Sequence, residues 1–153
     1  MRYILLIFSL LLYSCDNSTT EAEVIVDCCD EDAWNYNSET TEHDDSLCIF
    51  NFVFSTPSES NSFSDAEDVT ITWTGGNSTT NISLSVVDSE TDEEELVLSE
   101  SMENTSPFEW TIALTEDFLS GDKKIYILQN LNTDDTQDAD SLLSAFSSVF
   151  TIE

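Results

Sequence analysis

The feature that most limits the fold of this chain is a repeated alternation of apolar and polar residues. In the stretch DVTITWT, residues 68–74, the apolar residues Val69, Ile71 and Trp73 are separated by threonines. Successive side chains of a β-strand point to opposite faces, so this pattern predicts a strand with one buried side. The stretches NISLSVVD and PFEWTIA, at 81–88 and 107–113, have the same period.

Seven stretches of this kind occur between residues 49 and 153, and short turn-forming segments separate them. We expect strands within 49–55, 68–74, 81–88, 95–100, 107–113, 123–130 and 147–153. Turn residues such as Gly75-Gly76-Asn77 and Gly121-Asp122 lie between them. No long amphipathic helix is evident, although residues 138–146 are compatible with one helical turn. The pattern predicts an all-β domain of two antiparallel sheets packed face to face.

The first fifteen residues, MRYILLIFSLLLYSC, predict export and lipid attachment. The apolar run is shorter than the roughly 20 residues that span a bilayer, so it is typical of a signal peptide. Leu12, Ser14 and Cys15 resemble a bacterial lipobox, in which Cys15 accepts the lipid. We expect a protein held in the cell envelope by acyl chains, in the outer membrane, and leave open whether it is exposed at the cell surface.

The charge of the chain excludes several classes of partner. The full sequence has 32 acidic residues against three basic ones, a formal net charge of −29. Such a field repels phosphate backbones and anionic lipid surfaces, so we expect no nucleic-acid partner. Most acidic runs, such as DSETDEEE at 88–95, are typical of solvated loops.

We divide the chain into four parts. Residues 1–14 are the signal peptide, 15–27 an acylated polar tether, 28–48 a cysteine-bounded acidic segment, and 49–153 the β-sandwich domain.

The domain at 49–153 resembles a known family. Pro57-Ser58, Val69 to Trp73, Trp110, and Ser147 to Ile152 match the pattern of the fungal cell-wall-synthesis (KRE/KNH) N-terminal domain, which belongs to the Ser-Thr-rich glycosylphosphatidylinositol-anchored membrane family. The resemblance implies a seven-stranded immunoglobulin-like β-sandwich and, less directly, a role in the cell wall. Within such a sandwich, Trp73 and Trp110 are expected in the core.

The segment CCDEDAWNYNSETTEHDDSLC, residues 28–48, raises the question of a metal site, a reactive thiol or a covalent link. Adjacent Cys28 and Cys29 lack the spacing that structural zinc sites favour, although His43 and Cys48 complete a possible ligand set. The surrounding acids disfavour a reactive thiolate. Calcium at Asp30, Asp32, Asp44 and Asp45 remains open, because carboxylates are its preferred ligands.

This segment also resembles a small repeat with the pattern C-x-D-x-x-A-x-N-Y-N…D-D-x-x-C, found in surface and secreted proteins of gliding bacteria. Cys28, Ala33 and the Asn35-Tyr36-Asn37 motif carry the resemblance, and Ala33 places Cys28 in the register of the first cysteine. It implies a disulfide between Cys28 and Cys48, which fits an oxidising compartment. Pairing of Cys29 with Cys48 is the alternative if the register is off by one.

No catalytic residues are predicted. The chain has one histidine and three glycines, so neither a Ser-His-Asp set nor a glycine-rich phosphate loop can be argued. We expect a non-enzymatic, lipid-anchored surface protein without a firmly implied cofactor, which binds or organises an extracellular glycan or another surface protein. An accessory subunit of a carbohydrate-active or secretion complex, and a passive acidic spacer, are the alternatives.

Overall fold

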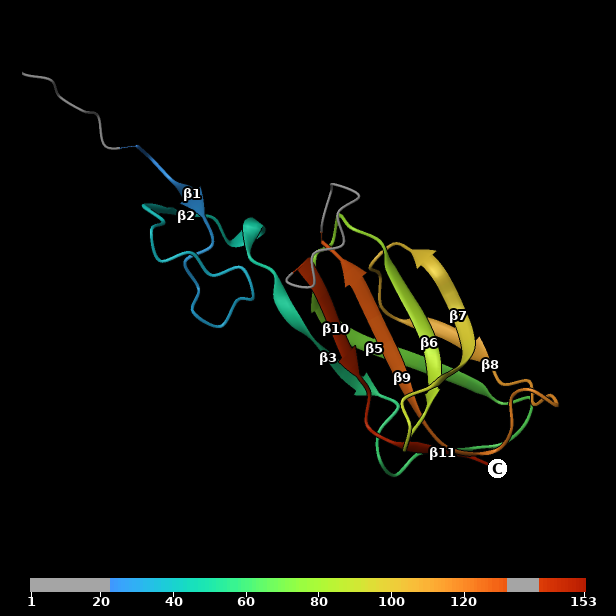
Figure 1. Ribbon diagram of the computed structural model, residues 1–153. Helices are drawn as coiled ribbons and strands as arrows, with labels where there is room; N and C mark the ends of the chain where they lie inside the picture. Colours follow the sequence, from blue (N-terminus) through green and yellow to red (C-terminus); the bar gives the residue numbers. More distant parts are fainter. Residues whose placement is uncertain (1–22, 132–140) are drawn as a thin grey trace, which may run out of the picture.

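The computed structural model describes residues 23–131 and 141–153, and this part of the chain is mostly β-strand (Figure 1). A 3-10 helix spans Asp45–Leu47. The strands are β1 Val26–Asp27, β2 Glu42–His43, β3 Phe50–Thr56, β4 Ser62–Phe63, β5 Asp68–Gly76, β6 Ile82–Asp88, β7 Glu94–Met102, β8 Phe108–Thr111, β9 Gly121–Asn130, β10 Leu142–Phe146 and β11 Phe150–Ile152.

Within the described residues the strands after residue 49 form two sheets. One has the order β3-β5-β8, and the other has the order β4-β11-β9-β6-β7, with β10 also paired to β9. All of these pairings are antiparallel except that of β11 with β4. Figure 1 shows β10, β9, β6 and β7 in front of β5 and β8. The prediction of antiparallel sheets is confirmed, and every stretch predicted as a strand contains one.

One hydrophobic core takes side chains from both sheets. Alternate residues of β5, namely Val69, Ile71 and Trp73, are buried together with alternate residues of β6 and β9. Trp110 of β8 is also buried and packs against Phe118, with ring centroids 5.9 Å apart. The two tryptophans are therefore core residues, as their strand positions predict.

The end of β5 depends on its two glycines. Gly75 and Gly76 have φ angles of +94° and +73°, a region that side chains with a Cβ rarely adopt. A Cβ on Gly75 would also collide with the carbonyl oxygen of Asn51. Only glycine at position 75 therefore lets the end of β5 lie this close to the backbone of β3.

The compatibility of residues 138–146 with a helical turn was misleading. Leu142–Phe146 is strand β10, which pairs with β9 from Tyr126 to Asn130. Leu143 is buried in the core while Leu142 and Phe146 are exposed, so tertiary packing decides the conformation of this short apolar run. The described part of the chain holds no helix long and apolar enough to span a membrane.

Candidate functional site

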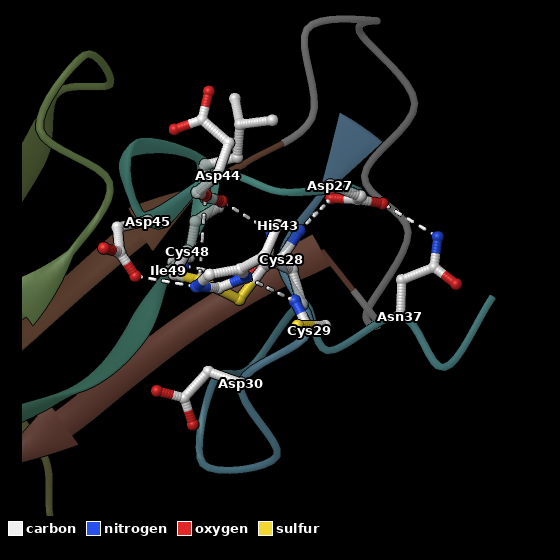
Figure 2. Close-up of a disulfide and its surroundings, with 12 residues drawn as sticks. Asp27, Cys28, Cys29, Asp30, Asn37, His43, Asp44, Asp45, Cys48 and Ile49 are labelled. Carbon is white, nitrogen blue, oxygen red and sulfur yellow. Dashed lines mark hydrogen bonds and ion pairs between the residues drawn. A yellow bond between two sulfur atoms is a disulfide. The ribbon is translucent and has the colours of Figure 1, made fainter. Parts of the chain in front are cut away.

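A small unit formed by residues 25–49 precedes the two sheets and is closed by a disulfide between Cys28 and Cys48 (Figure 2). Their Cα atoms lie 4.9 Å apart, and Cys28 is fully buried. The predicted pairing is therefore correct in its register. Cys29 has a free, exposed thiol.

The start of this unit lies earlier than the predicted tether boundary at residue 27. β1 pairs in parallel with β2, which joins Val26 to Glu42 and Asp27 to His43. The carboxylate of Asp27 accepts hydrogen bonds from Asn37 Nδ2 at 2.9 Å and from the backbone N–H of Cys28 at 2.8 Å. These bonds, the one from Asn37 above all, lower the pKa of Asp27 below its ordinary value.

Asn35 connects the small unit to the start of β3. Its side chain donates to the carbonyl of Leu47 at 2.8 Å and accepts from the N–H of Ile49 at 2.8 Å. The N–H of Trp34 also donates to the carbonyl of Ile49 at 2.7 Å. The Asn-Tyr-Asn motif thus has a structural use, since Asn37 binds the beginning of the unit and Asn35 its end.

The histidine of the segment holds the loop around the disulfide. His43 Nδ1 accepts a hydrogen bond from the backbone N–H of Cys29 at 3.1 Å, and Nε2 lies 2.7 Å from Asp45 Oδ1. Figure 2 shows the imidazole beside the disulfide. Both ring nitrogens are therefore engaged in local contacts of the loop.

Three of the four aspartates proposed for calcium, namely Asp30, Asp44 and Asp45, use their carboxylates in local contacts. Asp30 accepts from the N–H of Asp32 at 2.9 Å, and Asp44 accepts from the N–H and hydroxyl of Ser46 at 2.9 and 2.6 Å. These bonds from Ser46 lower the pKa of Asp44. Asp45 contacts His43. Figure 2 shows Asp30 and Asp44 on opposite sides of the disulfide.

Within residues 23–131 and 141–153, no group of three or more His, Cys, Asp or Glu side chains is arranged to hold a metal ion. The zinc alternative also loses two of its ligands, because Cys28 and Cys48 are bonded to each other. Calcium binding by this segment stays a prediction.

A hollow of about 240 Å³ lies between the small unit and the sheets, lined by residues 46–49 and 76–79. Its sheet-side wall is held by the fully buried Gln129 of β9. Gln129 Nε2 donates to the carbonyls of Asn77 and Thr80 at 2.8 and 2.7 Å, and its Oε1 accepts from the N–H of Asn77 at 2.7 Å. This wall is therefore a firmly held loop.

The second candidate surface is the solvent side of the larger sheet, which we call the outer face. Because Ile125, Ile127 and Gln129 point inward, the residues between them point outward. Cross-strand register places β6 and β10 residues beside them. The outer face comprises Ser83, Lys124, Tyr126, Leu128, Asn130, Leu142, Ser144 and Phe146, whereas Ser85 and Val87 of β6 are buried.

Two aromatic rings lie side by side on the outer face. Phe146 is opposite Tyr126 in the strand register, and their ring centroids are 4.8 Å apart with planes inclined by 32°. Phe146 is 45% exposed although it belongs to a regular strand. Lys124 Nζ lies 5.5 Å from the centre of the Phe146 ring and forms an ion pair with Asp92 at 2.9 Å.

A shallow hollow of about 150 Å³ continues the outer face past Leu128. It is lined by Asn81, Ile82, Ser83, Glu100, Ser101, Leu128 and Asn130. Asn81 Nδ2 donates to the hydroxyl of Ser101 at 2.9 Å, so the polar groups of this wall are held in place. The outer face therefore joins an aromatic pair to a polar depression.

No protein-family model, curated protein or solved structure matches this chain.

Of the predicted site residues, the structure brings Cys28 and Cys48 together, and Cys15 lies outside the described residues. The outer face was missed. Tyr126 and Leu128 could have been found from the alternation within residues 123–130, but the helical reading of 138–146 hid their neighbours Leu142 and Phe146.

Proposed function

We propose that this protein is a non-enzymatic, lipid-anchored binding domain of the cell envelope, whose outer face contacts an extracellular glycan or another surface protein. Acylated Cys15 holds it to the outer membrane. We include an immunoglobulin-like sandwich in this proposal, because two antiparallel sheets share one core.

The observation that carries the proposal is the composition of the outer face. Phe146, Leu142 and Tyr126 lie in reach of solvent at neighbouring positions of β9 and β10. None of the eight residues of the outer face is acidic, although Asp122 of β9 and Glu100 of β7 border it. An exposed cluster of aromatic and apolar side chains without a carboxylate, on a chain this acidic, is typical of an interaction site.

Two features of the amino-terminal part support export. The apolar run and Cys15 fit a lipoprotein signal. The Cys28–Cys48 disulfide fits an oxidising compartment such as the periplasm or the cell surface.

A passive acidic spacer is the second candidate, and the net charge of −29 favours it because such a charge keeps molecules apart. A spacer needs no exposed aromatic pair, so the outer face separates the two functions. An accessory subunit of a larger complex would use the same face against a protein. Calcium at residues 30–45 would add rigidity to either function.

Co-sedimentation with isolated cell-envelope fragments tests the proposal. We expect the full chain to bind the fragments and Phe146→Ser to lose most of the binding. Val53→Ser is the matched control, because Val53 is 60% exposed but lies on β3 of the other sheet. A Phe146→Ser variant that binds like the wild type, or a wild type that does not bind, would favour the spacer.

A further inference from the structure

We infer that the ligand of the outer face is an uncharged polysaccharide, bound lengthwise along β9 with one sugar ring against Tyr126 and Phe146. This inference rests on the proposed function and adds the chemical class of the ligand. It is carried by the alternation of rings and hydroxyl groups, by the charge around them, and by the shape of the face.

The side chains of the outer face suit a ligand that is apolar on one side and polar at its edges. Tyr126 and Phe146 present ring surface, while Ser83 and Ser144 stand at the cross-strand positions on either side of Leu128. A pyranose ring has apolar C–H faces and an equatorial rim of hydroxyls, so it can stack on the rings while its rim meets serine hydroxyls and amides. A protein interface core would instead favour an uninterrupted apolar centre.

Charge selects against anionic glycans. Lys124 is the cation of the outer face, and it is already paired with Asp92 and lies over Phe146. Glu94 and Glu100 of β7 border the face, and the chain as a whole carries a net charge of −29. A uronic-acid polymer would be repelled by these carboxylates, because the paired Lys124 cannot offset the repulsion. A neutral polysaccharide would not be repelled. The same charge disfavours a second copy of this chain as the partner.

The geometry fits an elongated ligand. Lys124, Tyr126, Leu128 and Asn130 follow one another on the same side of β9, and this row is about 20 Å long at roughly 3.3 Å per residue. The aromatic pair lies toward one end of the row and the hollow near Asn81 and Ser101 toward the other. A short oligosaccharide can therefore occupy both at once.

The test is affinity electrophoresis and calorimetry of the full chain in detergent. Dextran, soluble starch, galactomannan and xyloglucan serve as neutral probes, and alginate and polygalacturonate as anionic ones. We expect at least one neutral polymer to bind, and both Tyr126→Ser and Phe146→Ser to weaken that binding tenfold or more. Val53→Ser should change it less than twofold, and melting temperatures confirm that each variant is folded.

Three outcomes would overturn the inference. They are a failure of all four neutral polymers to bind, stronger binding of an anionic polymer, and neutral binding that survives both serine substitutions. Protease treatment of the envelope fragments shows whether only the polysaccharide ligand is wrong or the proposed binding function is wrong as well. If Phe146-dependent binding to the fragments is lost after proteolysis, the ligand is a protein, so the proposed function holds and the polysaccharide is excluded.

Discussion

Cys28 and Cys48 are joined by a disulfide that spans a sequence separation of 20 residues and brings their Cα atoms to 4.9 Å. The unit that it closes has a small apolar interior, because Ala33 is buried whereas Trp34, Tyr36 and Leu47 remain exposed. Burial alone therefore gives this unit little stability, and the covalent link must supply much of it.

Replacing both Cys28 and Cys48 by alanine should open the small unit. In the chain-entropy model, a disulfide that closes a loop of this length stabilises the folded state by about 3 kcal/mol, and the double variant loses this contribution. Hydrogen exchange of residues 28–48 should become fast while the sheets keep their protection. Cys29→Ala is the control, since its thiol is free and exposed. Unchanged exchange in the double variant would show that hydrogen bonds alone hold the unit.

Trp73→Ala should destabilise the sheets by about 3–5 kcal/mol, the usual cost of truncating a buried tryptophan. Trp73 is 4% exposed, and its Nε1 donates to Asn104 Oδ1 at 2.8 Å. Denaturant unfolding measures the change. Trp34→Ala provides a comparison, because Trp34 is 39% exposed and should cost much less. Equal losses for the two variants would contradict the assigned core.

Gln129→Leu should cost about 2 kcal/mol or more, because the N–H of Asn77 and the carbonyl of Thr80 lose the amide that they bind, at about 1–3 kcal/mol each. The carbonyl of Asn77 keeps its hydrogen bond from Asn104 Nδ2 at 3.3 Å. Thermal unfolding is the measurement. Asn81→Leu, a change of an exposed amide, should stay within about 1 kcal/mol. A neutral Gln129→Leu would mean that the turn after β5 is held by other contacts.

The small unit should lose stability in acid through Asp27. Its pKa is lowered in the folded protein, chiefly by the hydrogen bond from Asn37. A lowered folded pKa gives stabilisation that is complete above the unfolded value of about 3.9 and is lost as the pH falls through the folded value. Hydrogen exchange of the Cys28 amide between about pH 5 and 2 follows this loss. Asp27→Asn should flatten the profile, whereas Glu31→Gln, an exposed change in the same loop, should leave it unaltered.

Cys15→Ala should move the protein from the detergent phase to the aqueous phase, because two or three acyl chains are needed for stable anchoring. Mass spectrometry should lose the acylated amino-terminal peptide. Cys29→Ala serves as the control cysteine variant. If the Cys15→Ala protein still partitions with membranes, the lipobox assignment fails.

Local pattern was sufficient for much of this fold, whereas the disulfide was indicated by the resemblance to a cysteine-bounded repeat. Strands such as 68–74 are predictable because one buried face enforces strict alternation. The strand at 142–146 was not predictable, since Leu-Leu-Ser-Ala-Phe suits a helix equally well and only pairing with β9 decides its conformation. The outer face was missed for the same reason: Tyr126 and Phe146 are distant in the sequence and become neighbours only through strand register.

The role of Gln129 also depends on tertiary structure. A glutamine on the inward side of a strand contradicts the apolar pattern, and the carbonyls that it binds belong to a turn 52 and 49 residues away in the sequence. Similarly, Asn35 and Asn37 could be recognised as a motif, but their hydrogen bonds to the two ends of the small unit could not be derived from spacing.

Amide chemical-shift mapping with envelope polysaccharide tests most directly whether the outer face is the binding surface. We expect the perturbed amides to gather at Tyr126, Leu128, Ser144 and Phe146, with the threonines of β5 on the opposite side of the molecule unaffected. Perturbations centred on β5 or on residues 28–48, or no perturbation at saturating polysaccharide, would contradict it.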